Sequence, residues 1–371
     1  MAKARLRDLG ITLGQMQPGP LNAITDVAGI KVGFSTVIRD EPHVVRSGVT
    51  AIWPADDIYT DFMFAGIHSF NGNGEMTGSH WINEQGLLAA PITITNTHAV
   101  GVARDAICVH AARKGIDQAW HLPVAAETWD GWLSDAETFP VTLDMAIEAL
   151  DSAKAGPVPE GNIGGGTGMI THEFKGGTGT ASRRLSAADG GWTVGALVQS
   201  NYGRRSLLRC GHAPVGLELN TDVVTSAHAE RKEEQGSIIV ILATDAPLLP
   251  IQCQRLARRA TTGLAWVGGI GSNGSGDIFL AFSTGNRVPL KSKMADVRML
   301  GMEECTPLFQ AAAEATEEAI WNALCAAETM TGYKGRTAHA VPHDLLKQAV
   351  AQYARRGGTL CQKELTSLSP D

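Results

Sequence analysis

Short apolar runs alternate with helical patterns along this chain. Runs typical of β-strands occupy residues 49–53, 92–95, 194–198, 238–243 and 278–282. The run at 238–243 is apolar at every position, which predicts a strand buried on both faces. The pattern therefore predicts a protein of mixed α and β structure.

Three helices are predicted between and after these strands. Apolar residues recur at helical spacing over residues 143–150, and an alanine-rich helix is expected over 306–329, packed tightly against a sheet. A last helix should begin at Asp344 and end near Gly357 and Gly358, because glycine is common where helices stop. No internal repeat or low-complexity linker divides the sequence, which favours one structural domain.

Composition narrows the classes of partner. The chain has 371 residues, 44% of them hydrophobic and 19% charged, and its net charge of −7 argues against nucleic acid as the main partner. The first eight residues lack the apolar segment of a secretory signal, and no run approaches the ~20 apolar residues that span a membrane. The six cysteines have no CxxC spacing, which favours reduced thiols. We expect a cytoplasmic protein without membrane contact.

Gly236 and Ser237 lie between a charged run, residues 229–234, and the buried strand. A cut between them would leave Ser237 with a free α-amine, so that its hydroxyl can act as nucleophile and its amine as base. Such an amine titrates near pH ~7.7–8.0, which suits proton transfer at neutral pH. Glycine and serine also form ordinary turns that enter strands, and the two residues alone favour that simpler interpretation.

Six further segments change this balance. They are residues 22–29, 126–131, 161–169, 199–203, 243–249 and 273–279. Together and in this order they resemble the self-processing aminopeptidase family that includes L-aminopeptidase/D-esterase and the β-peptidyl aminopeptidases. The resemblance runs from residue 7 to residue 335. It implies a four-layer αββα sandwich of the N-terminal-nucleophile-hydrolase type, cut into residues 1–236 and 237–371 within one structural domain.

The resemblance also implies roles for two polar residues. Asn201 matches the asparagine that donates a hydrogen bond to the oxyanion of the tetrahedral intermediate. From its local sequence alone, a turn asparagine that caps its own backbone would be favoured. Glu127 matches the glutamate that holds the substrate's free ammonium group, a natural partner for a carboxylate. The alternative for Glu127 is a solvated loop carboxylate.

Trp129 stands where some relatives have a tyrosine assigned to the active site. An indole has one N–H donor and cannot accept a proton, so no acid–base role is transferred to this residue. Its bulk instead indicates a wall of the pocket that receives the substrate's side chain. Trp132 is a looser candidate for the same wall, and the motif at residues 71–76 is expected to border the pocket.

Ser275 and Asp277 precede the strand at 278–282. Positions i and i+2 of an extended chain face the same side, so the hydroxyl and the carboxylate can line up behind Ser237 and orient it. Relatives use a serine and an acid at this spacing for that purpose. The neighbouring glycines, residues 269–274, match GxGxxG, but a strand rather than a helix follows, which excludes a dinucleotide site.

The sequence as a whole predicts an aminopeptidase that matures by autoproteolysis and acts on small peptides, amino-acid amides or esters. The acyl-enzyme would form on Ser237, with no metal and no organic cofactor. The resemblance implies a homo-oligomer of processed units, commonly four. Two alternatives are an N-acyltransferase of the ornithine acetyltransferase type and a non-catalytic binding protein on the same scaffold, which would stay uncut.

Overall fold

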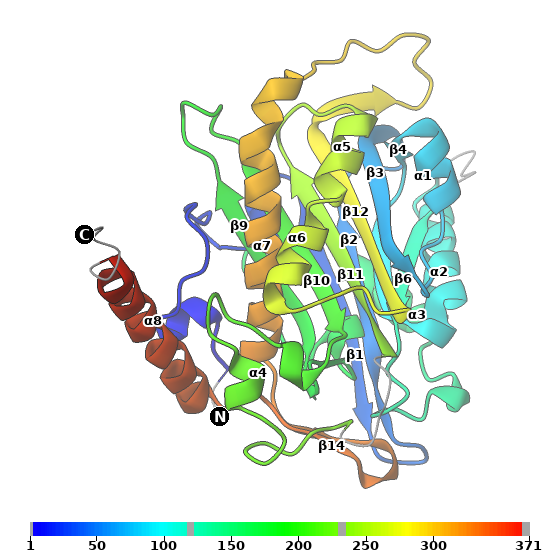
Figure 1. Cartoon of the computed structure of the whole chain (residues 1–371). Helices are drawn as coiled ribbons and strands as arrows, with labels where there is room; N and C mark the ends of the chain where they lie inside the picture. Colours follow the sequence, from blue (N-terminus) through cyan, green and yellow to red (C-terminus); the bar gives the residue numbers. More distant parts are fainter. Residues whose placement is uncertain (1–2, 117–121, 229–234, 366–371) are drawn as a thin grey trace.

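The computed structural model describes residues 3–116, 122–228 and 235–365, so the charged run at 229–234 lies outside the described residues. A four-stranded sheet has the order β1-β2-β5-β6 and a six-stranded sheet the order β4-β3-β12-β11-β10-β9 (Figure 1). The first consists of β1 (Lys31–Arg39), β2 (Val45–Trp53), β5 (Ile92–Asn96) and β6 (Val124–Thr128). The second consists of β3 (Asp61–Gly72), β4 (Leu87–Leu88), β9 (Gly177–Arg184), β10 (Thr193–Asn201), β11 (Gln235–Thr244) and β12 (Gly274–Pro289).

Helices cover the outer face of each sheet. The four-stranded sheet is covered by α2 (Val100–Arg113) and α3 (Leu143–Asp151). The six-stranded sheet is covered by α5 (Pro250–Ala257), α6 (Ala260–Val267) and α7 (Thr306–Cys325). The two sheets pack on each other through an apolar core, so the layers run helix, sheet, sheet, helix. This order confirms the αββα fold that the sequence predicted.

The remaining elements are short or peripheral. They are α1 (Ser79–Gln85), α4 (Val215–Glu218), α8 (His343–Leu365), β7 (Ile170–Thr171), β8 (Phe174–Lys175), β13 (Met330–Thr331) and β14 (Thr337–Ala338). The pairs β7–β8 and β13–β14 are small hairpins outside the two main sheets. Within the described ranges, no helix is both long and apolar enough to cross a membrane.

The side chains of β11 alternate between two cores. Ile238 and Val240 pack in the core that includes α5, α6 and α7, whereas Ile239 and Ile241 pack in the core between the sheets. All four are fully buried, and each such burial stabilises the fold by roughly 1.5–3 kcal/mol. The expected strand with two buried faces is therefore confirmed, and the alternation turns Ser237 toward the space between the sheets.

The expected tight packing of the alanine-rich helix is confirmed where α7 crosses β9. A Cβ on Gly179 would lie 2.0 Å from the backbone oxygen of Ala319, so only glycine lets the two backbones approach this closely. The helix itself ends at Cys325, earlier than the expected residue 329.

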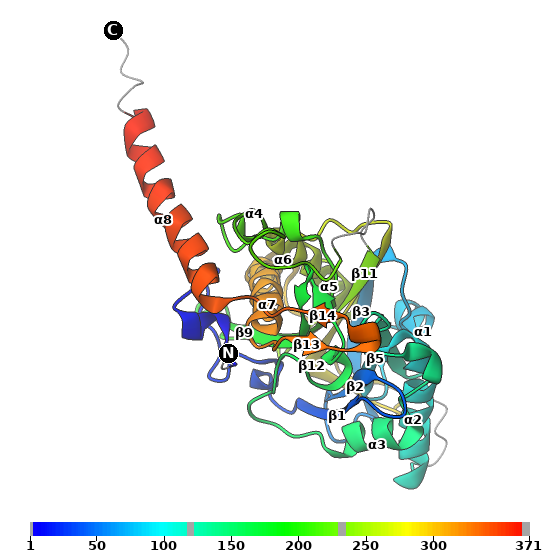
Figure 2. The ribbon, with the colours of Figure 1, turned by 90° about the horizontal axis from the view of Figure 1, so that it is seen from below.

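The predicted end of the last helix is wrong. α8 begins at His343 and continues through Gly357 and Gly358 to Leu365, and it projects away from the sheets (Figure 2). Glycine ends a helix when it adopts the left-handed conformation; in a helical conformation it only lowers stability, by about 1 kcal/mol relative to alanine. Two consecutive glycines in a sequence that otherwise favours a helix were therefore insufficient evidence that the helix ends there.

Candidate functional site

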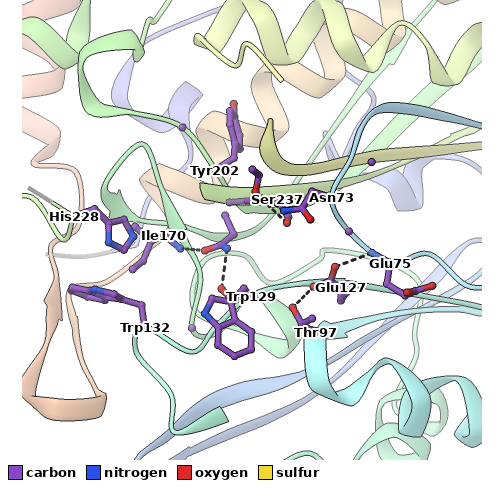
Figure 3. Close-up of a pocket in the computed structure, with 17 residues that line it drawn as sticks. Asn73, Glu75, Thr97, Glu127, Trp129, Trp132, Ile170, Tyr202, His228 and Ser237 are labelled. Atoms are coloured by element: carbon purple, nitrogen blue, oxygen red, sulfur yellow. Dashed lines mark hydrogen bonds between the residues drawn. The ribbon is translucent and has the colours of Figure 1, made fainter. Parts of the chain in front are cut away.

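A cavity of about 650 Å³ opens at the end of the six-stranded sheet where β11 begins (Figure 3). Its wall comes from loops and strand ends that are far apart in the sequence. The described lining residues are Gly72, Asn73, Gly74, Glu75, Thr97, Glu127, Trp129, Trp132, Gly168, Ile170, Asn201, Tyr202, Gly203, His228, Gly236, Ser237 and Gly274. Five of the seven predicted site residues are among them, namely Asn201, Glu127, Trp129, Gly236 and Ser237.

Ser237 is the third residue of β11 and only 5% exposed. Its Oγ donates a hydrogen bond of 2.7 Å to the carbonyl oxygen of Gly236, so the hydroxyl lies beside the peptide bond at which cleavage is predicted. A Cβ on residue 236 would lie 2.4 Å from the backbone oxygen of Asn201. Glycine is needed before Ser237 because β10 leaves no room for a side chain.

Asn201 is the last residue of β10 and pairs with Ser237 across the antiparallel ladder. Its Oδ1 accepts from the backbone N–H of Ile170 at 2.8 Å, and its Nδ2 donates to the backbone oxygen of Trp129 at 2.9 Å. The Ile170 N–H is a donor and the Trp129 oxygen an acceptor, so the two partners together fix the positions of the amide oxygen and the amide nitrogen of Asn201. The amide nitrogen carries a second N–H, which is available for a group bound in the cavity.

Glu127 is buried in the cavity wall, with 3% exposure, and is not a solvated loop carboxylate. It belongs to β6, next to Thr95 of β5. One carboxylate oxygen accepts from the backbone N–H of Glu75 at 2.9 Å and the other from the hydroxyl of Thr97 (Figure 3). Burial raises the pKa of Glu127, although the two hydrogen bonds oppose that rise. The site thus holds a buried carboxylate that faces the cavity without a basic partner among its described contacts.

Two tryptophans form part of the wall. Trp129, 38% exposed, meets the ring of His98 edge-on with 5.0 Å between ring centres. Trp132 meets the ring of His228 in the same way at 5.0 Å. Both indoles line the cavity, which is where the sequence placed Trp129 and, less firmly, Trp132.

Ser275 and Asp277 are joined to each other, as the i, i+2 spacing predicted. The Oγ of Ser275 donates to Oδ1 of Asp277 at 2.6 Å, and both residues are buried. In the parallel pairing of β11 with β12 they align with Gly236 and Ile238, on either side of Ser237. Ile238 faces the layer of α5, α6 and α7, and side chains alternate between the two faces of a sheet. Ser275 and Asp277 therefore lie on that same face, opposite to the face from which the side chain of Ser237 projects. Neither residue is among the described lining of the cavity.

Several lining residues were not foreseen. Tyr202 follows Asn201 inside one of the recognised segments, so proximity to that residue was the available signal. Thr97 and His228 carry no local signal, because they reach the cavity only through the packing of β5 and of the loop after α4. The motif at residues 71–76 was, by contrast, expected to border the pocket, and its residues 72–75 line the cavity at the end of β3.

Comparisons with known proteins agree with this geometry. The model of peptidase family S58 matches residues 22–338. Two relatives are β-peptidyl aminopeptidases BapA: that of Sphingosinicella microcystinivorans is 45% identical over 95% of this chain and 93% of its own, and that of Sphingosinicella xenopeptidilytica is 41% identical over 96% and 93%.

Solved structures give the same picture. A β-aminopeptidase from Burkholderia sp. has a TM-score of 0.88 and 47% identity, covering 94% of this chain and 99% of its own. The L-aminopeptidase D-Ala-esterase/amidase of Ochrobactrum anthropi, described as a prototype serine aminopeptidase and a variant of the Ntn hydrolase fold, has a TM-score of 0.88 and 46% identity over 95% and 99%. The resemblance read from the six segments is confirmed.

Proposed function

The chain belongs to peptidase family S58, and on that premise we propose that it activates itself by cutting the bond between Gly236 and Ser237 and then works as a serine aminopeptidase. The family and its relatives place it among the hydrolases, as an aminopeptidase with an Ntn-hydrolase-like fold. The observation that carries the proposal is the meeting of Ser237, Asn201 and Glu127 in one cavity.

Maturation would proceed in two steps. In the intact chain, Oγ of Ser237 attacks the carbonyl carbon of Gly236, the C–N bond breaks, and the nitrogen of Ser237 gains the proton that the hydroxyl loses. Water then hydrolyses the resulting ester, which yields the carboxylate of Gly236 and a Ser237 with both hydroxyl and α-amine free. The 2.7 Å contact between this hydroxyl and the Gly236 carbonyl supports the first step. The products are residues 1–236 and 237–371.

The mature site would use the same hydroxyl on substrates. Glu127 binds the substrate's ammonium, Oγ of Ser237 attacks the carbonyl carbon of the first bond, and the α-amine of Ser237 takes the hydroxyl proton. Asn201 donates from Nδ2 to the oxyanion, and removal of one such donor typically costs about 10²–10³ in rate. The leaving group departs with the proton, and water hydrolyses the acyl-enzyme to release the N-terminal amino acid. Ser275 and Asp277, which are hydrogen-bonded to each other behind Ser237, orient Ser237 and support its proton transfer.

The substrates in this proposal are small peptides, amino-acid amides and esters with a free amine. Two relatives carry the name β-peptidyl aminopeptidase, so short amides that begin with a β-amino acid are the first to test, beside their L- and D-α counterparts. We also propose an oligomer of processed units, commonly four in the family that the sequence resembles. The cytoplasmic location stays a prediction.

A mass spectrum and a turnover assay test the proposal together. Purified wild-type protein should contain two chains with the masses of residues 1–236 and 237–371, and should hydrolyse free amides but not their N-acetylated forms. Ser237→Ala should remain one chain and be inactive. A wild-type chain that is intact and fully active would overturn self-processing, and product that forms only by transfer to an added amine would favour the acyltransferase.

A further inference from the structure

Lys175 is a fully buried basic residue beside the cavity wall. Its Nζ donates to the backbone oxygens of Met169 and Gly176, each at 2.8 Å, and it forms no ion pair within the described part of the chain. Burial lowers the pKa of this lysine to about 7. Burying an ammonium without a counter-ion costs several kcal/mol, which an apolar side chain of the same length would avoid. The lysine therefore needs an explanation beyond packing.

The two ends of one peptide unit connect Lys175 to Asn201. The carbonyl of Met169 accepts from Nζ of Lys175 and from the backbone N–H of Gly176 at 2.9 Å. The N–H of the same peptide, on Ile170, donates to Oδ1 of Asn201 at 2.8 Å (Figure 3). Donors on a carbonyl polarise the peptide and strengthen its N–H as a donor, because hydrogen bonds in a chain reinforce one another.

We propose that Lys175 is a positioning residue for acyl transfer, which acts through the Met169–Ile170 peptide to hold the amide of Asn201 with its Nδ2 toward the cavity. The inference rests on the proposed function, since it requires Asn201 to donate to the oxyanion. With an apolar residue at 175, the carbonyl of Met169 keeps only one donor and the Ile170 N–H weakens. The side-chain amide of Asn201 is then less firmly oriented. Its second Nδ2 hydrogen, which would donate to the oxyanion, is no longer preorganised for the transition state.

A double-mutant cycle tests whether Lys175 acts through Asn201. The proteins are wild type, Lys175→Met, Asn201→Ala and the double variant, all confirmed as cleaved by mass spectrometry, with single-turnover rates measured on one amide substrate. We expect Lys175→Met to lower the rate about tenfold, below the about 10²–10³ typical of losing the donor itself, with little change in KM. In the Asn201→Ala background the same change should have almost no further effect, because groups that act as a unit are not additive.

A matched control separates this role from general support of the fold. Arg205 is another buried basic residue, and its side chain donates to backbone oxygens near the same hairpin, those of His172, Glu173, Leu219 and Val224. Arg205→Met should lower the thermal midpoint, and any rate loss should be the same with and without Asn201. If Lys175→Met behaved in that way too, Lys175 would be structural and the proposal would fail.

Two further variants separate the possible outcomes. Lys175→Gln retains a neutral donor; it should lose less rate than Lys175→Met, and it replaces that variant in the cycle if the methionine protein does not accumulate folded. Ser237→Ala is measured alongside. Turnover by Ser237→Ala at the wild-type rate would refute the proposed function itself, whereas an inactive Ser237→Ala with fully multiplicative losses at 175 and 201 would refute only the role of Lys175.

Discussion

Asn201 and Ser237 are directly opposed residues of β10 and β11, and both face the space between the two sheets. Opposed residues of an antiparallel pair have Cβ atoms about 4.5–5.5 Å apart. A primary amide and a hydroxyl at that separation can both reach one carbonyl group placed between them. Strand pairing thus fixes the distance between the two groups, and loops need only supply the rest of the wall.

The first prediction concerns the space around Gly236. A Cβ there would lie 2.4 Å from the Asn201 oxygen and 2.8 Å from Cα of Tyr202, both of which are backbone atoms that cannot move alone. Gly236→Ala should therefore slow cleavage and lower stability by about 1–3 kcal/mol, as overpacked sites do. Gel densitometry over time and thermal melting measure the two effects. Gly101→Ala, in open space on α2, is the control and should cleave normally; equal cleavage by both variants would contradict the role of space at 236.

The second prediction concerns the anchor for the substrate's amine. Glu127→Gln removes the charge and keeps the size, so kcat/KM for free amino-acid amides should fall about 10–100-fold, the value of a charge-assisted hydrogen bond. Cleavage at Ser237 should be unaffected, because that step involves no substrate ammonium. Glu137→Gln, at an exposed carboxylate, is the control and should match the wild type.

The same residue predicts a pH dependence. Burial raises the pKa of Glu127, so on acidification it takes up a proton at a higher pH than an ordinary glutamate. The substrate ammonium keeps its charge there, and KM of the wild type should rise as pH falls through the raised pKa. Glu127→Gln should show no such rise. A KM with the same pH profile in both proteins would remove Glu127 from this role.

The third prediction treats Ser275 and Asp277 as one unit. Their 2.6 Å hydrogen bond means that Asp277→Asn also disturbs the orientation of Ser275. We expect each single change to cost roughly 10²–10⁴ in the chemical step, the range of positioned proton-transfer groups. The double change, Ser275→Ala with Asp277→Asn, should cost little more than the worse single one. Single-turnover rates on cleaved protein measure this, and losses that multiply would show that the two residues act independently.

The fourth prediction uses stability to test the burial of Lys175. Its pKa of about 7 lies below the ordinary 10.5, so between these values the unfolded chain binds a proton that the folded chain does not. Stability contributed by this residue therefore rises with pH across that window, by up to roughly 1.4 kcal/mol per unit. Urea unfolding at pH 6 to 9, on the Ser237→Ala background, should show this rise relative to Lys175→Met. A difference that stays constant with pH would mean that the ammonium is not desolvated.

The sequence predicted the secondary-structure elements better than the tertiary contacts between them. The strand at 238–243 was evident because every position is apolar, whereas Ser237, just before that run, became a candidate nucleophile only through the six further segments. The pairing of Asn201 with Ser237 joins positions 36 residues apart through a register that no local pattern specifies. Their shared cavity could be expected only from the resemblance to a known family.

Buried charges were the least predictable feature. Glu127 lies in a stretch with Asp130 and Asp135, which has the composition of a loop, yet its pairing in β6 buries it. Lys175 precedes two glycines and resembles the end of a surface hairpin, but the surrounding layers exclude water from it. Both side chains are buried by segments distant in sequence, so their exposure follows from tertiary packing alone.

The strand order of the larger sheet has a consequence for the matured enzyme. β12, and β11 from Ser237 onward, come from the piece that begins at Ser237, and they lie between β3 on one side and β10 on the other, both from the piece that ends at Gly236. The two polypeptides would therefore be interleaved in one hydrogen-bonded sheet, and neither could leave without breaking ladders on both flanks. We expect the nicked protein to melt in a single cooperative transition, with the fragments parting only on full denaturation.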